Sequence, residues 1–543
     1  MKWWVIDAVI VVLLAVVSGI WFTWHHAYGA YGDDSPGYIY AAHQLITGES
    51  LVQQDPLVQD ALTWFGYEPW ARFVAPAHHE IISPEGWTAS RYPIGLSVLM
   101  AGAVKATGNA LTMYLVVPLT AVAVVIATYL GAVWLLPAPA PWKRVLGIGA
   151  ACVVMGSTLF FTYSVAQPMR EIPALLFFLL AAFLVIKTKQ WYWLALAGML
   201  FGYSVAIRET NLILIIPLVC YGLRRKWLAF SIGALIMYSP FLWYAAQITQ
   251  HKEVFREKDI TTIAITSNID HIQSFSVSNL WNNQGKFKPG VGGLNQYWSV
   301  TKQFSVWPLF LLSIVVGLIY LWKHQRPSFY LFSSWIVVVV VLFAAWINPY
   351  PRYVLPILPV LAWLSMFGAM TLWQWFSSQL KLKRWVSLSL AGLLALSFIA
   401  SYQPVFASRQ EYLATGTPQD RELTKTDLTT IQAAIATVQA DSLTTGQPAL
   451  LVMLGETKGG LAETIMTHTT IQTIRFPNKD KEQPPLDQLQ AYFEHLDETY
   501  TLYLWYDPSV TADEQRFYNQ STLTPVTLLS TSFKPEISIL RIE

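Results

Sequence analysis

The sequence predicts a mostly α-helical, polytopic membrane protein with a soluble α/β domain at its carboxyl end. Its mean hydropathy is +0.40, and only 13% of its 543 residues are charged, against about 25% in soluble proteins. Long apolar segments recur through residues 1–402, whereas residues 403–543 are polar and mixed in charge. We therefore expect a transmembrane domain over 1–402 and a soluble domain over 403–543.

Eleven segments are candidates for transmembrane helices, which need about 17 to 25 mostly apolar residues. They are residues 4–24, 111–136, 145–163, 167–186, 191–207, 209–223, 227–246, 304–322, 329–346, 353–373 and 385–400. The first segment is too long and too aromatic for a cleaved signal peptide, so we expect it to remain as a signal anchor.

A twelfth apolar segment, residues 93–107, is short, begins at a proline and contains Lys105. If it does not cross the membrane and the N-terminus is cytoplasmic, every short basic cluster between later spans lies inside, as the positive-inside rule expects. These clusters are Lys143 and Arg144, Lys187 and Lys189, Arg224 to Lys226, Lys323 with Arg326, and Lys381 with Lys383 and Arg384. We therefore expect 93–107 to be interfacial or re-entrant, and loops 25–110 and 247–303 and the soluble domain to lie outside the cytoplasm.

The soluble domain has two kinds of pattern. Residues 420–438 and 486–496 are helix-like, and 449–454, 470–474, 501–506 and 537–542 are short strand-like runs, which indicate a small α/β domain. The domain has no glycine fingerprint for phosphate binding. In the second outer loop, the Gly-rich KPGVGGLNQYW is interpreted as a flexible loop.

The charge and cysteine content argue against nucleic-acid binding and against a cysteine-based disulfide or metal site. A formal charge of +2 gives no indication of nucleic-acid binding. Cys152 and Cys220 both lie inside apolar runs, so we interpret them as packing residues rather than as a disulfide or a metal site.

The ionisable residues of the spans from residue 111 onward lie at the span ends. Proton and ion pathways need such groups at membrane depth, so this layout disfavours a secondary transporter. The charged residues collect instead at the expected outer ends, where they predict a site. They are Asp33, Asp34, His78, His79, Glu80, Arg91, Arg170, Glu171, Arg208, Glu209 and Arg352.

Asp33 and Asp34 precede Ser35 and Pro36, which begin an amphipathic helical pattern. Asp is a favoured N-cap, and its charge suits the helix dipole, so capping alone explains one of the two acids. The other acid is then available as a base or a metal ligand.

The remaining candidates each have a plain structural interpretation beside a functional one. The pairs Arg170–Glu171 and Arg208–Glu209 are explained equally by local ion pairing at a helix start. Arg352 is explained by a snorkelling arginine beside interfacial tyrosines such as Tyr353. His78 and His79 are weak metal candidates, because adjacent histidines point in different directions in regular structure.

These segments together resemble the GT-C superfamily of polytopic glycosyltransferases, in its protein O-mannosyltransferase and aminoarabinose-transferase-like branch. The resemblance covers roughly residues 4–402 and is carried by GDDSPGYIYAAHQLITGE, RYPIGLSVLMA, MREIPALLFFLLAAFLVI and RYVLPILPVLA, in that order. The sequence departs from the family pattern at Ile94, where a second proline is common. The soluble domain matches no family module, which leaves the acceptor open.

The resemblance implies an inverting transferase that uses a polyprenyl-phosphate sugar as donor and a lipid, glycan or protein as acceptor. The acceptor hydroxyl needs a carboxylate base, for which Asp33 is the first choice, with Asp34 beside it and the two roles exchangeable. Glu171 is the expected second acid, orienting the acceptor or a divalent ion. Arg352 and Arg208 are expected to bind the phosphate, with Arg91, Arg170, Glu209 and Tyr353 as further substrate-binding candidates.

Two questions stay open at this stage. Some enzymes of the superfamily use a divalent metal and others do not, so the cofactor is undecided. A non-catalytic carrier or flippase for a lipid-linked precursor is the alternative function. A carrier predicts polar groups part-way down the spans and function without Asp33, whereas an enzyme predicts an apolar bundle with an acidic outer site.

Overall fold

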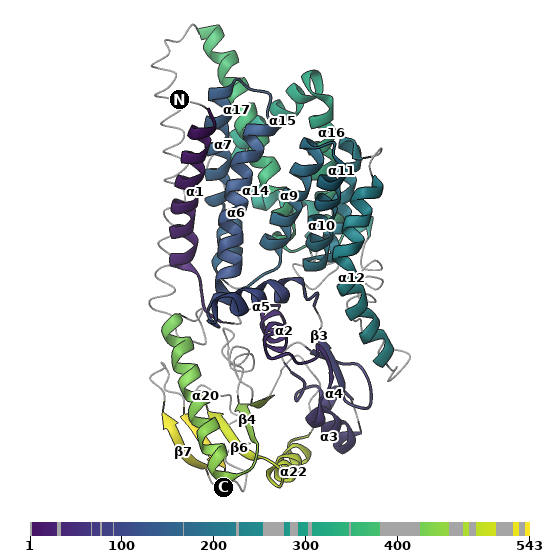
Figure 1. The fold of residues 1–543 in the computed structure, drawn as a ribbon, viewed down its shortest axis with the longest axis vertical. Helices are drawn as coiled ribbons and strands as arrows, with labels where there is room; N and C mark the ends of the chain where they lie inside the picture. The colour runs from purple at the N-terminus through teal and green to yellow at the C-terminus, as the bar shows by residue number, and fades with distance from the viewer. Residues whose placement is uncertain are drawn as a thin grey trace.

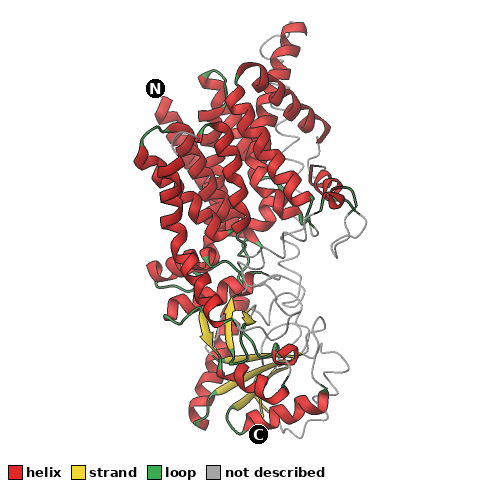
Figure 2. Ribbon diagram, turned by 90° about the vertical axis from the view of Figure 1, so that its right-hand side faces the viewer, coloured by secondary structure: helices red, strands yellow, loops and turns green. Residues whose placement is uncertain are grey.

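The protein is a long molecule with a helical bundle at one end and a mixed β-sheet at the other (Figures 1 and 2). It is described by a computed structural model over residues 3–29, 34–66, 68–76, 79–90, 92–166, 168–223, 227–252, 276–282, 291–301, 307–346, 349–380, 424–454, 471–476, 485–506, 525–530 and 538–542. The amino-terminal helix and the carboxyl terminus lie at opposite ends of the molecule (Figure 1).

Five of the described helices are long and apolar enough to cross a membrane. They are α1 (Trp3–His25), α6 (Thr112–Leu135), α12 (Trp227–His251), α16 (Arg326–Ala344), and η4 (Pro351–Ile357) continuing into α17 (Leu358–Leu380). A sixth span forms if α7 (Ala140–Met155) and α8 (Thr158–Val165) are counted together, although they are bent by 62°. The protein is therefore a multi-pass membrane protein.

The remaining bundle helices are shorter. They are α9 (Glu171–Lys187), α10 (Trp191–Ile207), η1 (Glu209–Leu214) with α11 (Ile215–Tyr221), and α15 (Trp307–His324). Each overlaps one of the eleven predicted segments, but none of them is among the five spans found in the described residues, so the count of eleven is not confirmed. The predicted segment 385–400 lies outside the described residues.

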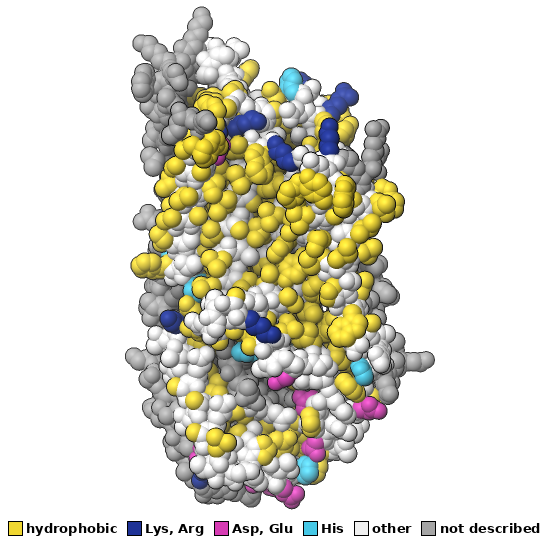
Figure 3. Space-filling model, viewed as in Figure 1, with side chains coloured by type: hydrophobic (Ala, Val, Ile, Leu, Met, Phe, Trp, Pro, Cys, Tyr) yellow, Lys and Arg dark blue, Asp and Glu magenta, His cyan; other side chains and the backbone are white. Residues whose placement is uncertain are grey.

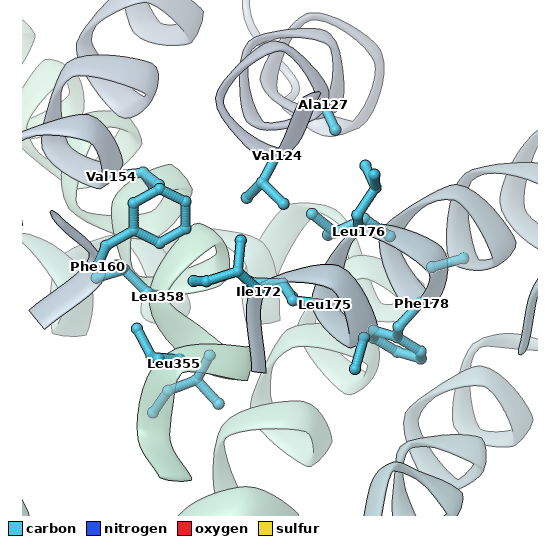
Figure 4. Packing of buried hydrophobic residues seen from close by; sticks show 14 of the residues in the cluster. Val124, Ala127, Val154, Phe160, Ile172, Leu175, Leu176, Phe178, Leu355 and Leu358 are labelled. Carbon is cyan, nitrogen blue, oxygen red and sulfur yellow. The ribbon is translucent and has the colours of Figure 1, made fainter. Parts of the chain in front are cut away.

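The bundle is held by close packing, because lipid provides no hydrophobic force between helices. Val124 of α6 faces Ile172 and Leu175 of α9 in the buried core (Figure 4). A Cβ atom on Gly198 of α10 would lie 1.9 Å from the Phe230 carbonyl oxygen of α12, so the two helices touch backbone to backbone. The outward face of the bundle is a broad apolar surface (Figure 3).

The described part of residues 25–110, the predicted first outer loop, folds into short elements below the bundle. They are α2 (Ser35–Thr47), α3 (Pro56–Phe65), α4 (Glu68–Ala71), α5 (Gly95–Thr107), and an antiparallel sheet in the order β1 (Val52–Gln54), β3 (Trp87–Ser90), β2 (His79–Ile81). Helix α5 covers the predicted interfacial segment. It has 13 residues, too few to span, and it lies across the end of the bundle (Figure 1).

The described part of residues 247–303, the predicted second outer loop, contains η3 (Val277–Leu280) and α14 (Gly293–Thr301). The interpretation of KPGVGGLNQYW as a flexible loop is wrong for its last residues, which form α14. The glycines serve close packing there. A Cβ atom on Gly293 would lie 2.1 Å from the Ala344 carbonyl oxygen at the end of α16.

The described carboxyl-terminal residues include a five-stranded sheet and two helices, α20 (Lys425–Thr445) and α22 (Leu486–Asp497). The strands are β4 (Ala449–Leu454), β5 (Gln472–Phe476), β6 (Thr501–Tyr506), β7 (Pro525–Ser530) and β8 (Ser538–Ile542), in the order β5-β4-β6-β8-β7. Strand β4 is parallel to β5 and β6, and β8 is antiparallel to β6 and β7. Four strands and both helices overlap the predicted segments.

One face of this sheet packs against the first outer loop. Tyr492 of α22 contacts the rings of Trp64 and Phe65 at the end of α3, with centroids 5.8 and 4.9 Å away. His495 stacks on Trp64 and lies 3.2 Å from the Asp60 carboxylate. Residues of α3, α4, α22 and the sheet form one buried apolar cluster. The opposite face of the sheet packs against α20 in a separate cluster.

Candidate active site

Asp34 occupies the N-cap position of α2, as the Ser-Pro pattern predicts, but its side chain does not cap the helix. The residue has helical backbone angles, and its carboxylate accepts no hydrogen bond from the first turn of α2. The carboxylate instead lies 2.9 Å from Nη2 of Arg352, and the residue is 7% exposed. Plain capping therefore does not account for Asp34. Its neighbour Asp33 lies outside the described residues.

Glu171 begins α9 and is almost completely buried, with 1% of its surface exposed. Its Oε1 atom lies 3.6 Å from Nε of Arg352, and its Oε2 atom has no hydrogen-bond partner in the described part of the chain. Since α9 packs against both α10 and η4, the acid lies at the junction of three segments that are distant in sequence.

Arg352 forms ion pairs with both of these acids. It lies in η4, where Pro351 and Pro356 restrict the backbone. Its guanidinium carbon is 5.2 Å from the ring centre of Tyr350 and 5.6 Å from that of Tyr353. The proposed phosphate ligand is thus an ion-pair bridge between Asp34 and Glu171 in this structure.

Arg208 follows the last residue of α10 and is 1% exposed. Its backbone carbonyl accepts a hydrogen bond from the Asn211 amide, while the Asn211 side chain donates to Ser204, whose hydroxyl donates to Ala174 of α9. This network fixes the turn between α10 and η1 against α9.

The Arg208 guanidinium lies between two aromatic rings, 5.1 Å from Phe343 and 5.2 Å from Tyr353. Both of its terminal nitrogens, Nη1 and Nη2, lack a hydrogen-bond partner among the residues that the structure describes. Buried donors are normally satisfied, and a planar fork with two donors suits a phosphate. Arg208 therefore has the geometry of an anion-binding residue.

Arg170 and Glu209 belong to the same electrostatic neighbourhood. Arg170 interacts with Asp34, Glu171, Glu209 and the Tyr38 hydroxyl. Tyr38 lies in α2, where burial raises its pKa well above the usual value, so it remains a neutral phenol. The cluster brings together acids and arginines from four of the segments that the sequence analysis singled out, at Asp34, Arg170–Glu171, Arg208–Glu209 and Arg352.

Three tyrosines of this region were not predicted as site residues. Tyr38 and Tyr163 interact electrostatically with the acids. Tyr297 of α14 is 6% exposed, its hydroxyl has no partner in the described ranges, and it interacts with Arg208 and Tyr353. The only feature of the sequence that could have indicated a role for Tyr297 is the preceding pair Gly292–Gly293. Gly293 allows α14 to approach the end of α16 closely.

The histidine candidates lie apart from this cluster or outside the described residues. His79 is on β2, where its ring contacts Tyr40 at 4.8 Å. His78 and Arg91 are not among the described residues. In the part of the chain that the structure covers, no three His, Cys, Asp or Glu side chains are grouped closely enough to hold a metal ion.

Neither the family models nor the curated sequences compared with the chain match it. Solved structures do. ArnT from Cupriavidus metallidurans matches with a TM-score of 0.55 and 12% identity, over 98% of this chain and 97% of that one. An oligosaccharyltransferase from Archaeoglobus fulgidus, tethered with an acceptor peptide, matches with 0.50 and 11%, over 93% and 69%.

The arabinofuranosyltransferase AftD from Mycobacteria matches with a TM-score of 0.55 and 13% identity, over 98% of this chain and 40% of AftD. These three proteins are GT-C glycosyltransferases. The chain therefore shares their fold, as the resemblance in its sequence implied.

Proposed function

On the premise of this shared fold, we propose that the protein is an inverting glycosyltransferase of the outer membrane face. It moves a hexose or pentose from a polyprenyl-phosphate donor to a lipid, glycan or protein acceptor. The observation that carries the proposal is the cluster of Asp34, Glu171, Arg208 and Arg352, which provides carboxylates for a proton and, in Arg208, a guanidinium group for a phosphate that is unpaired among the described residues.

The reaction joins the acceptor oxygen to the anomeric carbon as the bond from that carbon to the phosphate oxygen breaks. One carboxylate takes the proton of the acceptor hydroxyl, and the lipid phosphate leaves with the electron pair of the broken bond. We assign the base to Asp34, since its carboxylate forms no capping hydrogen bond with its own helix and lies 2.9 Å from Arg352. Asp33, the first choice from sequence, remains the competing assignment.

Arg208 is assigned to the leaving phosphate, because it is the buried guanidinium with two unsatisfied terminal nitrogens among the described residues. A cation at this position stabilises the charge that develops on the leaving oxygen. Arg170 and the Tyr297 hydroxyl both interact electrostatically with Arg208 and are assigned as further donors to the phosphate, and Glu171 is assigned to orient the acceptor.

We also propose that the N-terminus is cytoplasmic and that residues 403–543 form an extracytoplasmic domain. Several Lys and Arg side chains lie at the end of the bundle that is farther from the β-sheet (Figure 3), which is where the positive-inside rule expects the cytoplasmic side. In a cysteine-free background, a membrane-impermeant thiol reagent added outside should label Asn282→Cys and Leu443→Cys and miss Lys189→Cys. Labelling of Lys189→Cys alone would reverse the orientation.

The test of function is sugar transfer from a radiolabelled polyprenyl-phosphate hexose by the purified protein in detergent. Wild type is compared with Asp33→Asn, Asp34→Asn and Glu171→Gln, each checked for folding by size-exclusion chromatography. Turnover lost in Asp34→Asn and kept in Asp33→Asn supports the assignment of the base. The reverse result assigns Asp33, and a carrier function is supported if wild type moves the labelled lipid across vesicles without transfer.

A further inference from the structure

The acidic pair of the site is bridged by a cation that the chain itself supplies. We propose that Arg352 serves as a built-in cation at the position where a divalent metal ion would otherwise neutralise Asp34 and Glu171, so that turnover needs no metal. The proposal deepens the function proposed above and rests on it for its catalytic part.

The donor set argues against a metal ion while Arg352 is in place. A divalent ion bound by carboxylates needs several oxygen ligands close around it, at about 2.0 to 2.6 Å. Here the two carboxylates converge on a guanidinium, 2.9 Å from Nη2 to Asp34 and 3.6 Å from Nε to Glu171. No third acidic, His or Cys side chain joins them among the described residues.

The guanidinium is held by contacts independent of the acids. Two prolines restrict η4, and the guanidinium lies against the rings of Tyr350 and Tyr353. A guanidinium keeps its charge throughout the accessible pH range, and aromatic faces favour a cation. The positive charge is therefore fixed between Asp34 and Glu171 before any substrate binds.

This arrangement has a consequence for the two acids. Asp34 and Glu171 carry like charges and come from different segments, the start of α2 and the start of α9. Removing one partner of a buried ion-pair network leaves the other charges uncompensated. Without the Arg352 side chain, the two carboxylates would face each other across the space that the guanidinium occupied. Two carboxylates in this arrangement form a weak site for a divalent ion.

The proposal therefore predicts an exchange of cations. Wild-type transfer should be unchanged by EDTA, and Arg352→Ala should lose about a hundredfold or more of kcat, the usual cost of removing a transition-state electrostatic contact. Millimolar Mn²⁺ should restore part of that loss. Arg352→Met, which fills the space without a charge, should stay inactive with Mn²⁺, and so should Arg208→Ala.

Binding of Mn²⁺, followed by electron paramagnetic resonance on the full chain in detergent, tests the same exchange without turnover. We expect Arg352→Ala to bind one Mn²⁺ more than the double variant Arg352→Ala/Glu171→Gln, which lacks one of the two carboxylates. With Arg352 in place, we expect wild type to bind no more Mn²⁺ than Glu171→Gln does. The wild-type comparison remains valid even if Arg352→Ala fails to fold.

Three results would overturn the proposal. The first is loss of wild-type transfer in EDTA, the second is Mn²⁺ binding by wild type that Glu171→Gln abolishes, and the third is a folded Arg352→Ala that binds no additional Mn²⁺. Absence of turnover in wild type, with or without metal, would instead count against the proposed function and leave the binding result to decide the role of Arg352.

Discussion

At the scale of single residues, the site is distinguished by which charges have partners. Arg352 is engaged by two acids, whereas Arg208 lies between two rings with both terminal nitrogens unsatisfied among the described residues. The two arginines interact electrostatically, and we assign them different roles because their partners differ. The sequence analysis predicted both arginines as phosphate ligands. A sequence indicates that an arginine lies at the end of a span, but it does not show which side chain that arginine contacts.

Arg208→Gln should raise the KM for the lipid-linked donor and also lower kcat, because Arg208 is assigned to the phosphate both in the bound donor and as charge develops on the leaving oxygen. Hydrogen bonds to charged groups contribute about 1.5 to 3 kcal/mol, which corresponds to an increase of about tenfold to a hundredfold in KM. Steady-state kinetics over a range of donor concentration measures the change. Arg326→Gln, an exposed arginine at the start of α16, is the control and should leave KM unchanged.

His43 should make the folded protein sensitive to acid. Burial in α2 lowers the pKa of His43 to about 4, against about 6.5 in an unfolded chain. Between these values the unfolded chain binds a proton that the folded protein does not, so stability decreases as the pH falls from about 6.5 to 4. The melting temperature in detergent should fall over this window, and less steeply in His43→Gln. Equal slopes for the two proteins would contradict the assignment.

At the scale of elements, the position of Arg208 depends on how α5 meets α10. A Cβ atom on Gly95 would lie 2.6 Å from backbone atoms of Ala206 and Ile207, the two residues before Arg208. The Tyr203 hydroxyl also donates to the Gly95 carbonyl. The start of α5 is therefore pressed directly against the turn that carries the arginine.

Gly95→Ala should thus reduce sugar transfer, because the added methyl group must displace the end of α10. Gly102 lies on the same helix, and a Cβ atom added there would have nothing within 4 Å, so Gly102→Ala is the matched control and should keep wild-type activity. Comparing kcat/KM for the two variants measures the effect. Equal activities would show that the contact is not required for the geometry of the site.

Elements with a regular pattern were predictable and those defined by tertiary contacts were not. Strands β4, β5, β6 and β8 overlap their predicted segments, whereas β7 was missed because a register shift between Thr527 and Leu529 breaks its alternation. Helix α14 was missed because its glycines were interpreted as loop residues, although they allow close approach to α16. The position of Asp34 at the start of α2 was predictable, but its pairing with Arg352, more than 300 residues later, was not.

At the scale of the whole molecule, the carboxyl-terminal sheet and the first outer loop share one buried cluster. Tyr492 of α22 lies against Trp64 and Phe65 of α3, and His495 pairs with Asp60. These contacts connect the loop that carries Asp34 to residues that lie more than 400 positions later in the sequence. This contact predicts that the sheet stabilises α3, independently of any binding role of its own.

The prediction can be isolated with two tyrosines of the same sheet region. Tyr492→Leu removes the contact with α3, whereas Tyr503→Leu removes a fully buried tyrosine on the opposite face, in the cluster with α20. Both substitutions should destabilise the carboxyl-terminal residues, since each removes buried ring contacts. Only Tyr492→Leu should increase hydrogen exchange at residues 56–65, as measured by mass spectrometry on the detergent-solubilised protein.

The comparison separates a specific contact from general loosening of the sheet. If Tyr503→Leu exposes residues 56–65 as much as Tyr492→Leu does, the protection of α3 reflects only the overall stability of the sheet. If neither substitution changes the exchange, α3 is stabilised by the β1–β3–β2 sheet and the bundle alone. A selective effect of Tyr492→Leu would mean that the carboxyl-terminal residues hold the outer loop in place, and that truncating them would disturb the loop that carries the acid.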